Sequence, residues 1–259
     1  DTIDTMAKLY SKRIQIAPVG FEIDRVVLPA KKEKAEKVYL MVHKNITEAN
    51  YAVHKKYYTL IQKKLKAAKI ETELVYCDWK NVEEITRVAR DLILKEAGNE
   101  IAINLASGSK NHAIGLDRAC MTFRKRDNIH PFYPEAKNYR AVKYPCQQSS
   151  GVKQIKQVPI HRIIVPEPEL IEALRIIKDN STDIPLHKGK KGVKKKDLAK
   201  AYFGDSSKVN LTKLQRNITQ KLEKTWRAIE IIQVGQSDWI SLTNEGKYLR
   251  YVLKNEETY

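Results

Sequence analysis

Four consecutive residues in the middle of the chain, Ser107-Gly108-Ser109-Lys110, combine two hydroxyl groups, a flexible glycine and an ammonium group. They follow an apolar stretch at residues 101–105 that is typical of a strand, and the residues after them are typical of a helix. Backbone N–H groups at the start of a helix, together with the positive end of the helix dipole, attract negative charge. This order of strand, small-residue turn and helix predicts a binding site for an anion.

A second loop of similar composition, Ala17-Pro18-Val19-Gly20-Phe21-Glu22, follows an apolar stretch at residues 13–17. In a doubly wound sheet the first and fourth strands are neighbours, and ligands bind outside their carboxyl ends. The two loops would then face each other, and glycine lets a ligand approach the backbone closely. The alternative is that a glycine turn and a serine cap simply begin two helices. The residues that we expect to contact the ligand are Val19, Gly20, Phe21, Glu22, Ala106, Ser107, Gly108, Ser109, Lys110 and His112.

The elements needed to position these loops alternate regularly between strand and helix. We expect strands at residues 13–17, 37–43, 71–77, 101–105, 140–144 and 158–165, with a polar loop at 147–157. We expect helices at residues 21–36 (interrupted near Pro29), 49–69, 82–97 and 109–126. Strands joined by helices in this way predict an α/β, Rossmann-like parallel sheet with right-handed crossovers.

Composition limits the classes of protein and partner. The 259 residues carry 48 basic and 31 acidic side chains, a formal charge of +17, which favours nucleic acid or a phosphorylated ligand as partner. No apolar run approaches the roughly 20 residues that cross a bilayer, so we expect no membrane association. Cys77 and Cys120 lie in apolar patterns and are interpreted as core thiols, and with Cys146 they have no metal-ligand spacing. These features are typical of a reducing cytoplasm.

Several kinds of chemistry are disfavoured. The chain has neither the G-x-G-x-x-G dinucleotide motif nor the G-x-x-x-x-G-K-[ST] phosphate loop. No Ser/His/Asp set, carboxylate pair or metal cluster is readable, so we assign no catalytic residue, no metal and no cofactor beyond a possible nucleotide effector. His43 ends the second expected strand and Trp79 follows the third, and both are interpreted first as packing residues.

The chain changes character at Val165-Pro-Glu-Pro-Glu169, where two prolines follow the last expected strand. We expect helices at residues 169–178, 195–202 and 211–226, a lysine-rich loop at 188–196, strands at 228–234 and 238–243, and a final helix at 244–253. This order predicts an α+β winged helix-turn-helix, whose second helix enters the DNA major groove. The sequence thus predicts a ligand-sensing domain at residues 1–165 and a DNA-binding domain at residues 166–259.

The helix expected at residues 211–226 carries apolar residues at helical spacing: Leu211, Leu214, Ile218 and Leu222. Arginine and glutamine off that face suit base edges, and lysine suits a phosphate. The alternative is a winged helix used for protein packing. The residues that we expect to contact DNA are Lys195, Thr212, Lys213, Gln215, Arg216, Thr219 and Gln220.

With these motifs, residues 12–255 resemble archaeal CARF-type regulators, in which a CRISPR-associated Rossmann-fold sensor precedes a winged-helix domain, and they are most similar to a CARF-like group of transcriptional regulators. The resemblance lies in Ile16-Ala-Pro-Val-Gly-Phe-Glu22, Leu105-Ala-Ser-Gly-Ser-Lys110 and the winged helix. It implies a homodimer with one ligand pocket across the two-fold axis, often for a cyclic oligoadenylate. Ala106-Ser107-Gly108-Ser109 departs from the more usual Gly/Thr-rich loop, so ligand identity stays open.

The function predicted from the sequence is a ligand-responsive, DNA-binding transcriptional regulator that senses a phosphorylated nucleotide at a dimer interface. One alternative is a ring-nuclease-type enzyme that cleaves a cyclic oligonucleotide, with Lys110, Ser107 or Ser109 steadying a phosphate. Another is a protein-interaction module without DNA affinity.

Overall fold

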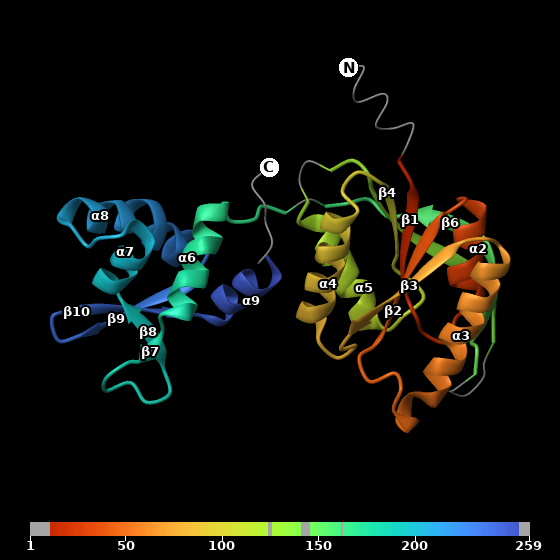
Figure 1. Cartoon of the computed structure of the whole chain (residues 1–259), viewed down its shortest axis with the longest axis horizontal. Coiled ribbons are helices and arrows are strands. Elements are labelled where there is room, and N and C mark those ends of the chain that lie inside the picture. The colour runs from red at the N-terminus through yellow and green to blue at the C-terminus, as the bar shows by residue number, and fades with distance from the viewer. Residues whose placement is uncertain (1–10, 124–125, 141–145, 162, 254–259) are drawn as a thin grey trace, which may run out of the picture. The chain divides into compact units, whose positions relative to one another are not determined.

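The computed structural model describes residues 11–123, 126–140, 146–161 and 163–253. The chain forms two compact units, unit 1 ending at Ile164 and unit 2 beginning at Val165 (Figure 1). Within the described ranges, no helix combines the length and the apolar character that crossing a membrane requires.

Unit 1 is built on a six-stranded sheet in the order β3-β2-β1-β4-β5-β6. The first five strands are parallel, and β6 runs antiparallel to β5. This is the strand order of a Rossmann-like fold, and it confirms the predicted pairing of the first and fourth strands. The strands are β1 (Arg13–Pro18), β2 (Lys37–His43), β3 (Glu71–Cys77), β4 (Glu100–Asn104), β5 (Ile129–Tyr139) and β6 (Ser149–Gln157).

Helices cover both faces of this sheet (Figure 1). They are α2 (Asp24–Lys32), the short 3-10 helix η1 (Ala49–Tyr51), α3 (Ala52–Ala67), α4 (Val82–Lys95) and α5 (Lys110–Met121). Successive strand residues point to opposite faces, so Tyr39 packs with residues of α4 and α5 whereas Leu40 packs with residues of α2 and α3. Burial on both faces explains why the central strands are almost continuously apolar.

The predicted elements agree best where the apolar pattern is long. Strands β2 and β3 have the predicted bounds, and Cys77 and Cys120 are free, buried thiols as predicted. Burial raises the pKa of each of these thiols to about 12. The predicted interruption at Pro29 is wrong, because Pro29 lies inside α2.

The predictions for the far edge of the sheet are wrong. The expected strand at residues 158–165 is absent from the described part of that segment, and the expected polar loop at 147–157 contains strand β6. Strand β5 was not predicted, because Pro131 and Pro134 interrupt its pattern. The strand expected at 140–144 lies almost wholly outside the described residues, and Arg140, which is described, is not in a strand.

Unit 2 contains helices around a small four-stranded sheet in the order β7-β8-β10-β9. Its core joins Leu174 of the first helix, Leu198, Leu222 and Ile240. The elements are α6 (Pro168–Asp179), β7 (Thr182–Asp183), β8 (Lys191–Lys194), α7 (Lys195–Phe203), α8 (Lys208–Lys213), η2 (Leu214–Thr219), η3 (Lys221–Thr225), β9 (Ile229–Val234), β10 (Ser237–Leu242) and α9 (Asn244–Val252). Strand β8 corrects the prediction of a loop at residues 188–196, since it pairs with β10 through Val193 and Lys194.

The helical stretch that begins with α8 changes its winding along its length. Residues 208–213 are α-helical, whereas η2 and η3 are π-helical. Hydrogen bonds in a π-helix join residues five apart instead of four, so each π turn moves the following side chains around the axis. The face that a strict α-helix would present therefore differs from the one this chain presents.

Candidate functional site

The two predicted loops lie side by side at the carboxyl edge of the sheet and are packed into each other. The hydroxyl of the buried Ser107 donates a hydrogen bond to the carbonyl oxygen of Pro18 at 2.8 Å. A Cβ atom at Gly20 would collide with the carbonyl oxygen of Ser107, and one at Gly108 would lie 2.6 Å from Pro18 Cβ. Glycine is therefore needed at both positions for close approach of the loops.

Helix α5 begins at the second loop with a capping box. The Ser109 side chain accepts the amide of His112, and His112 Nδ1 accepts the amide of Ser109 at 3.1 Å. Because Nδ1 is an acceptor, the proton of the neutral imidazole resides on Nε2. The amides of Lys110 and Asn111 belong to the first turn, where N–H groups have no partner within the helix. Lys110 is exposed beside them.

The acidic residue of the first loop faces the far strand of the sheet. Glu22 accepts a hydrogen bond from the hydroxyl of Ser149 on β6, and Arg25 Nη1 lies 4.0 Å from its carboxylate. Burial raises the pKa of Glu22, although Ser149 and Arg25 act in the opposite direction. Arg25 is itself buried and donates from Nε to the carbonyl oxygen of Pro134 at 2.9 Å. Neither Arg25 nor Ser149 was predicted, since both contacts join residues more than a hundred positions apart.

An aromatic and imidazole cluster occupies the same edge on the side of β2 and β3. We define it by His43, Tyr51, His54, Trp79 and His112. His43 stacks on Tyr51 with ring centroids 4.2 Å apart, and Trp79 lies 4.4 Å from His54 and 5.8 Å from His112. Trp79 also packs against the core, as predicted.

Burial favours the neutral form of two histidines of this cluster, His54 and His112. It lowers the pKa of His112 to about 4, with a smaller contribution from His43. Burial, again with His43, lowers the pKa of His54. At neutral pH the rings of His54 and His112 are therefore uncharged, so neither contributes positive charge at this edge.

Buried polar atoms without a partner are concentrated at this edge. Among the described residues, six buried side-chain atoms have no hydrogen-bond partner, and four of them are Arg25 Nη2, His54 Nδ1, Trp79 Nε1 and His112 Nε2. Each belongs to the segment that follows one of the first four parallel strands. Since buried polar atoms are nearly always paired in proteins, these four atoms mark where a water molecule or a ligand would complete the hydrogen bonding of the edge.

The structure assigns other predicted residues to packing. Val19 has a buried side chain, and its amide donates to the carbonyl oxygen of Met41 at 2.9 Å. The amide of Ala106 donates to Asn104 Oδ1 at 3.0 Å. Phe21 lies edge-on to Tyr57 with centroids 5.0 Å apart. In the described ranges, no group of three or more His, Cys, Asp or Glu side chains is arranged to hold a metal ion.

The predicted DNA-contacting residues fall into three groups. Thr212, Lys213, Arg216 and Gln220 are exposed. Gln215 is exposed too, but its amide oxygen accepts a 3.0 Å hydrogen bond from Lys195, which also pairs with Asp238 at 3.7 Å. Thr219 is buried, so its predicted place off the core face is wrong. The π-helical turn of η2 is the reason, because residues five apart share a face and Thr219 follows Leu214 into the core.

Comparison with known proteins gives one partial family match and one curated relative. Residues 13–139, just under half of the chain, match the family model described as "HFX_2341_N:-like, N-terminal". The chain is 26% identical over 187 residues to "Uncharacterized protein MJ1513" of Methanocaldococcus jannaschii, covering 63% of this chain and 55% of that protein. The chain therefore spans about half the length of the curated relative that it matches.

Solved structures give distant likenesses. Enterococcus italicus Csm6 bound to cyclic hexa-2'-fluoro-hexa-dAMP has a TM-score of 0.43 at 11% identity, with 82% of this chain and 53% of that chain covered. Can2 from Sulfobacillus thermosulfidooxidans in complex with cyclic tetra-adenylate has a TM-score of 0.40 at 8% identity, with 90% and 77% covered. At these values the likenesses carry no argument about the function of this chain.

Proposed function

We propose that this protein is a ligand-responsive, DNA-binding regulator in which unit 1 binds a phosphorylated nucleotide and unit 2 binds duplex DNA. The observation that carries the proposal is the carboxyl edge of the sheet. There the start of α5, the exposed Lys110 and four unpartnered buried atoms come from segments that follow adjacent strands. A phosphate accepts hydrogen bonds from backbone N–H groups at a helix start and from an ammonium group, and a nucleobase can stack on aromatic rings such as Trp79.

The resemblance of the two loops to CARF-type regulators makes a cyclic oligoadenylate the first ligand to test. In this proposal two copies of unit 1 pair, so that Lys110 of each copy faces one shared pocket. Calorimetry with linear and cyclic nucleotides, on wild type and on Lys110→Ala, tests the site. A charge-assisted hydrogen bond contributes roughly 1.5–3 kcal/mol, so the variant should bind about ten-fold or more weakly. Unchanged binding by the variant, or no binding of any phosphorylated compound by wild type, would contradict the proposed ligand site.

The proposal for unit 2 rests on its exposed helical face. Helices α7 and α8 with η2, followed by the hairpin of β9 and β10, agree with the order of a winged helix-turn-helix. Lys213, Arg216 and Gln220 are exposed on the helix that would enter the major groove. Binding to duplex DNA should weaken steeply with salt because phosphate neutralisation releases counterions. A mobility-shift titration between low and moderate salt tests it, and no binding at low salt would contradict it.

One contact favours a second candidate function, a ring-nuclease-type enzyme. Ser109 Oγ lies 2.9 Å from His112 Nδ1, and a neutral imidazole can accept a proton from a hydroxyl group. The capping box accounts for the same contact without any catalysis. Product analysis after incubation with cyclic oligoadenylates separates the two functions, because a sensor binds its ligand unchanged and an enzyme opens the ring.

A further inference from the structure

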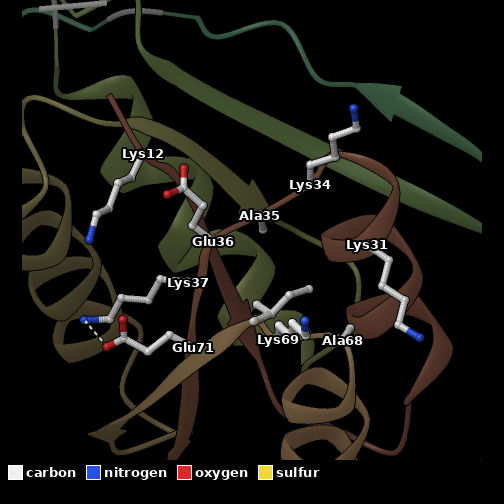
Figure 2. Close-up of a pocket in the computed structure, with 10 residues that line it drawn as sticks. Lys12, Lys31, Lys34, Ala35, Glu36, Lys37, Ala68, Lys69 and Glu71 are labelled. Atoms are coloured by element: carbon white, nitrogen blue, oxygen red, sulfur yellow. Dashed lines mark ion pairs between the residues drawn. The ribbon is translucent and has the colours of Figure 1, made fainter. Parts of the chain in front are cut away.

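A second basic site lies at the amino edge of the sheet, opposite to the loops described above. A pocket of about 580 Å³ opens between the ends of α2 and α3 and the starts of β1, β2 and β3 (Figure 2). Five lysines line it, against two carboxylates, Glu36 and Glu71. The lysines are Lys12, Lys31, Lys34, Lys37 and Lys69.

The charges of this pocket are only partly neutralised by its own residues. Lys37 pairs with Glu73 at 2.6 Å and with Glu71 at 3.5 Å. The described residues form no ion pair with the other four lysines of the pocket. Since Glu71 is taken by Lys37, four ammonium groups remain against the single carboxylate of Glu36. Figure 2 shows their ammonium groups spread around the pocket instead of meeting at one point.

Two of these lysines occupy backbone positions that usually belong to glycine. Lys34 has φ of 52° and Lys69 has φ of 60°, the left-handed region that side chains disfavour. Each follows the end of a helix in the same way, because the amide of Ala35 bonds Ala30 O at 2.8 Å and that of Ile70 bonds Leu65 O at 3.0 Å. This is the helix-ending motif in which glycine is the usual residue. At both equivalent positions the chain instead has a lysine that lines the same pocket.

The lining indicates the kind of ligand. Among the described residues that line the pocket, none is an arginine or an aromatic residue, so the lining itself offers no bidentate contact and no surface on which a base could stack. The guanidinium of Arg13 adjoins the pocket, where its Nε donates to the carbonyl oxygen of Lys34 at 3.1 Å. The amides of Lys34 and Lys69 are engaged in the helix ends and are not free to bind. The side chains that line the pocket would therefore recognise a ligand through several separated point charges, the lysine ammonium groups. A volume of about 580 Å³ is within the range of pockets for small molecules.

We propose that this pocket binds a compact polyphosphate chain, whether it comes from an inorganic polyphosphate or from the phosphate tail of a nucleotide. Several phosphates can each meet a different lysine, whereas a single small ion could reach few of them. The site is separate from the carboxyl edge and does not depend on the function proposed there.

Replacing both left-handed lysines by glycine tests the proposal on the full chain. Lys34→Gly with Lys69→Gly removes two charges and places the preferred residue at each left-handed position, so the fold should be kept. Lys178→Ala with Lys200→Ala removes the same charge from exposed positions in unit 2 and serves as the matched control. Calorimetry with inorganic tripolyphosphate at low salt measures the affinity, and thermal unfolding verifies the fold.

Wild type and control should bind tripolyphosphate equally, and the glycine variant about 2- to 30-fold more weakly, as expected for two exposed charge pairs. Adenosine triphosphate should bind like tripolyphosphate if the phosphates alone are recognised. Clearly tighter binding that the glycine variant also loses would indicate a nucleotide source, whereas tighter binding that the variant keeps would belong to the carboxyl edge. If the control variant bound tripolyphosphate as weakly as the glycine variant, the loss of affinity would be explained by net charge alone, and the proposal would be overturned. Unchanged binding by a folded glycine variant, or no binding by wild type, would also overturn the proposal.

Discussion

The buried imidazole of His112 makes the stability of unit 1 depend on pH. Its pKa is lowered by burial from 6.5 to about 4, so the unfolded chain binds this proton more readily than the folded chain does. Stability rises with pH wherever the unfolded state binds more protons. The contribution of His112 is therefore complete above pH 6.5 and decreases as the pH falls toward 4. At pH 5 the loss is about 2 kcal/mol, from 1.36 kcal/mol per pKa unit.

His112→Gln isolates this effect, because glutamine can complete the capping box at the same position but cannot titrate. The assay is urea unfolding at pH 7 and pH 5, followed by the fluorescence of Trp79 in a background with Trp226 and Trp239 changed to Phe. Wild type should lose about 2 kcal/mol more than His112→Gln between the two pH values. Equal losses in wild type and His112→Gln would refute the reasoning.

Three further outcomes are expected. Gly20→Ala should destabilise unit 1 by roughly 1–3 kcal/mol through its collision with Ser107, whereas Gly98→Ala, with open space around it, should be nearly neutral in the same urea titration. Ser107→Ala should cost about 1 kcal/mol through loss of its hydrogen bond to Pro18, and an unchanged midpoint would contradict that. Arg216→Ala should weaken a preferred DNA site by roughly 1–3 kcal/mol, whereas Thr219→Ala should lower stability without changing sequence preference, which competition binding would reveal.

The parts of the fold that were predicted correctly are those where burial requires a long, regular pattern of apolar residues in the sequence. Strands β2 and β3 are such cases, and the pairing of β1 with β4 follows from the common strand order. Strand β6 was missed because it is polar and ends the sheet, where β5 is its one pairing strand among the described residues. The amino-acid composition of β6 therefore resembles that of a loop.

The candidate site was predictable only in its local part. The loops of Gly20 and Ser107 follow strands whose order a general rule supplies, whereas Arg25 meets Pro134 across 109 positions and no local pattern reports that contact. Thr219 was misplaced for a different reason. Its helix changes from α to π winding at Leu214, and the sequence spacing that fits an α-helix gives no warning of the change.

The close packing of the loop at Gly20 against the loop at Ser107 and Gly108 has a consequence for how a ligand would bind. Gly20 and Gly108 are each packed against the opposite loop, and Ser107 joins them by a hydrogen bond, so neither loop can widen without disturbing the other. The two loops lose their conformational entropy when the protein folds, so binding a ligand does not have to order them. A ligand at the start of α5 would meet a preformed surface, so its association should be fast and its affinity should be set by how quickly it leaves.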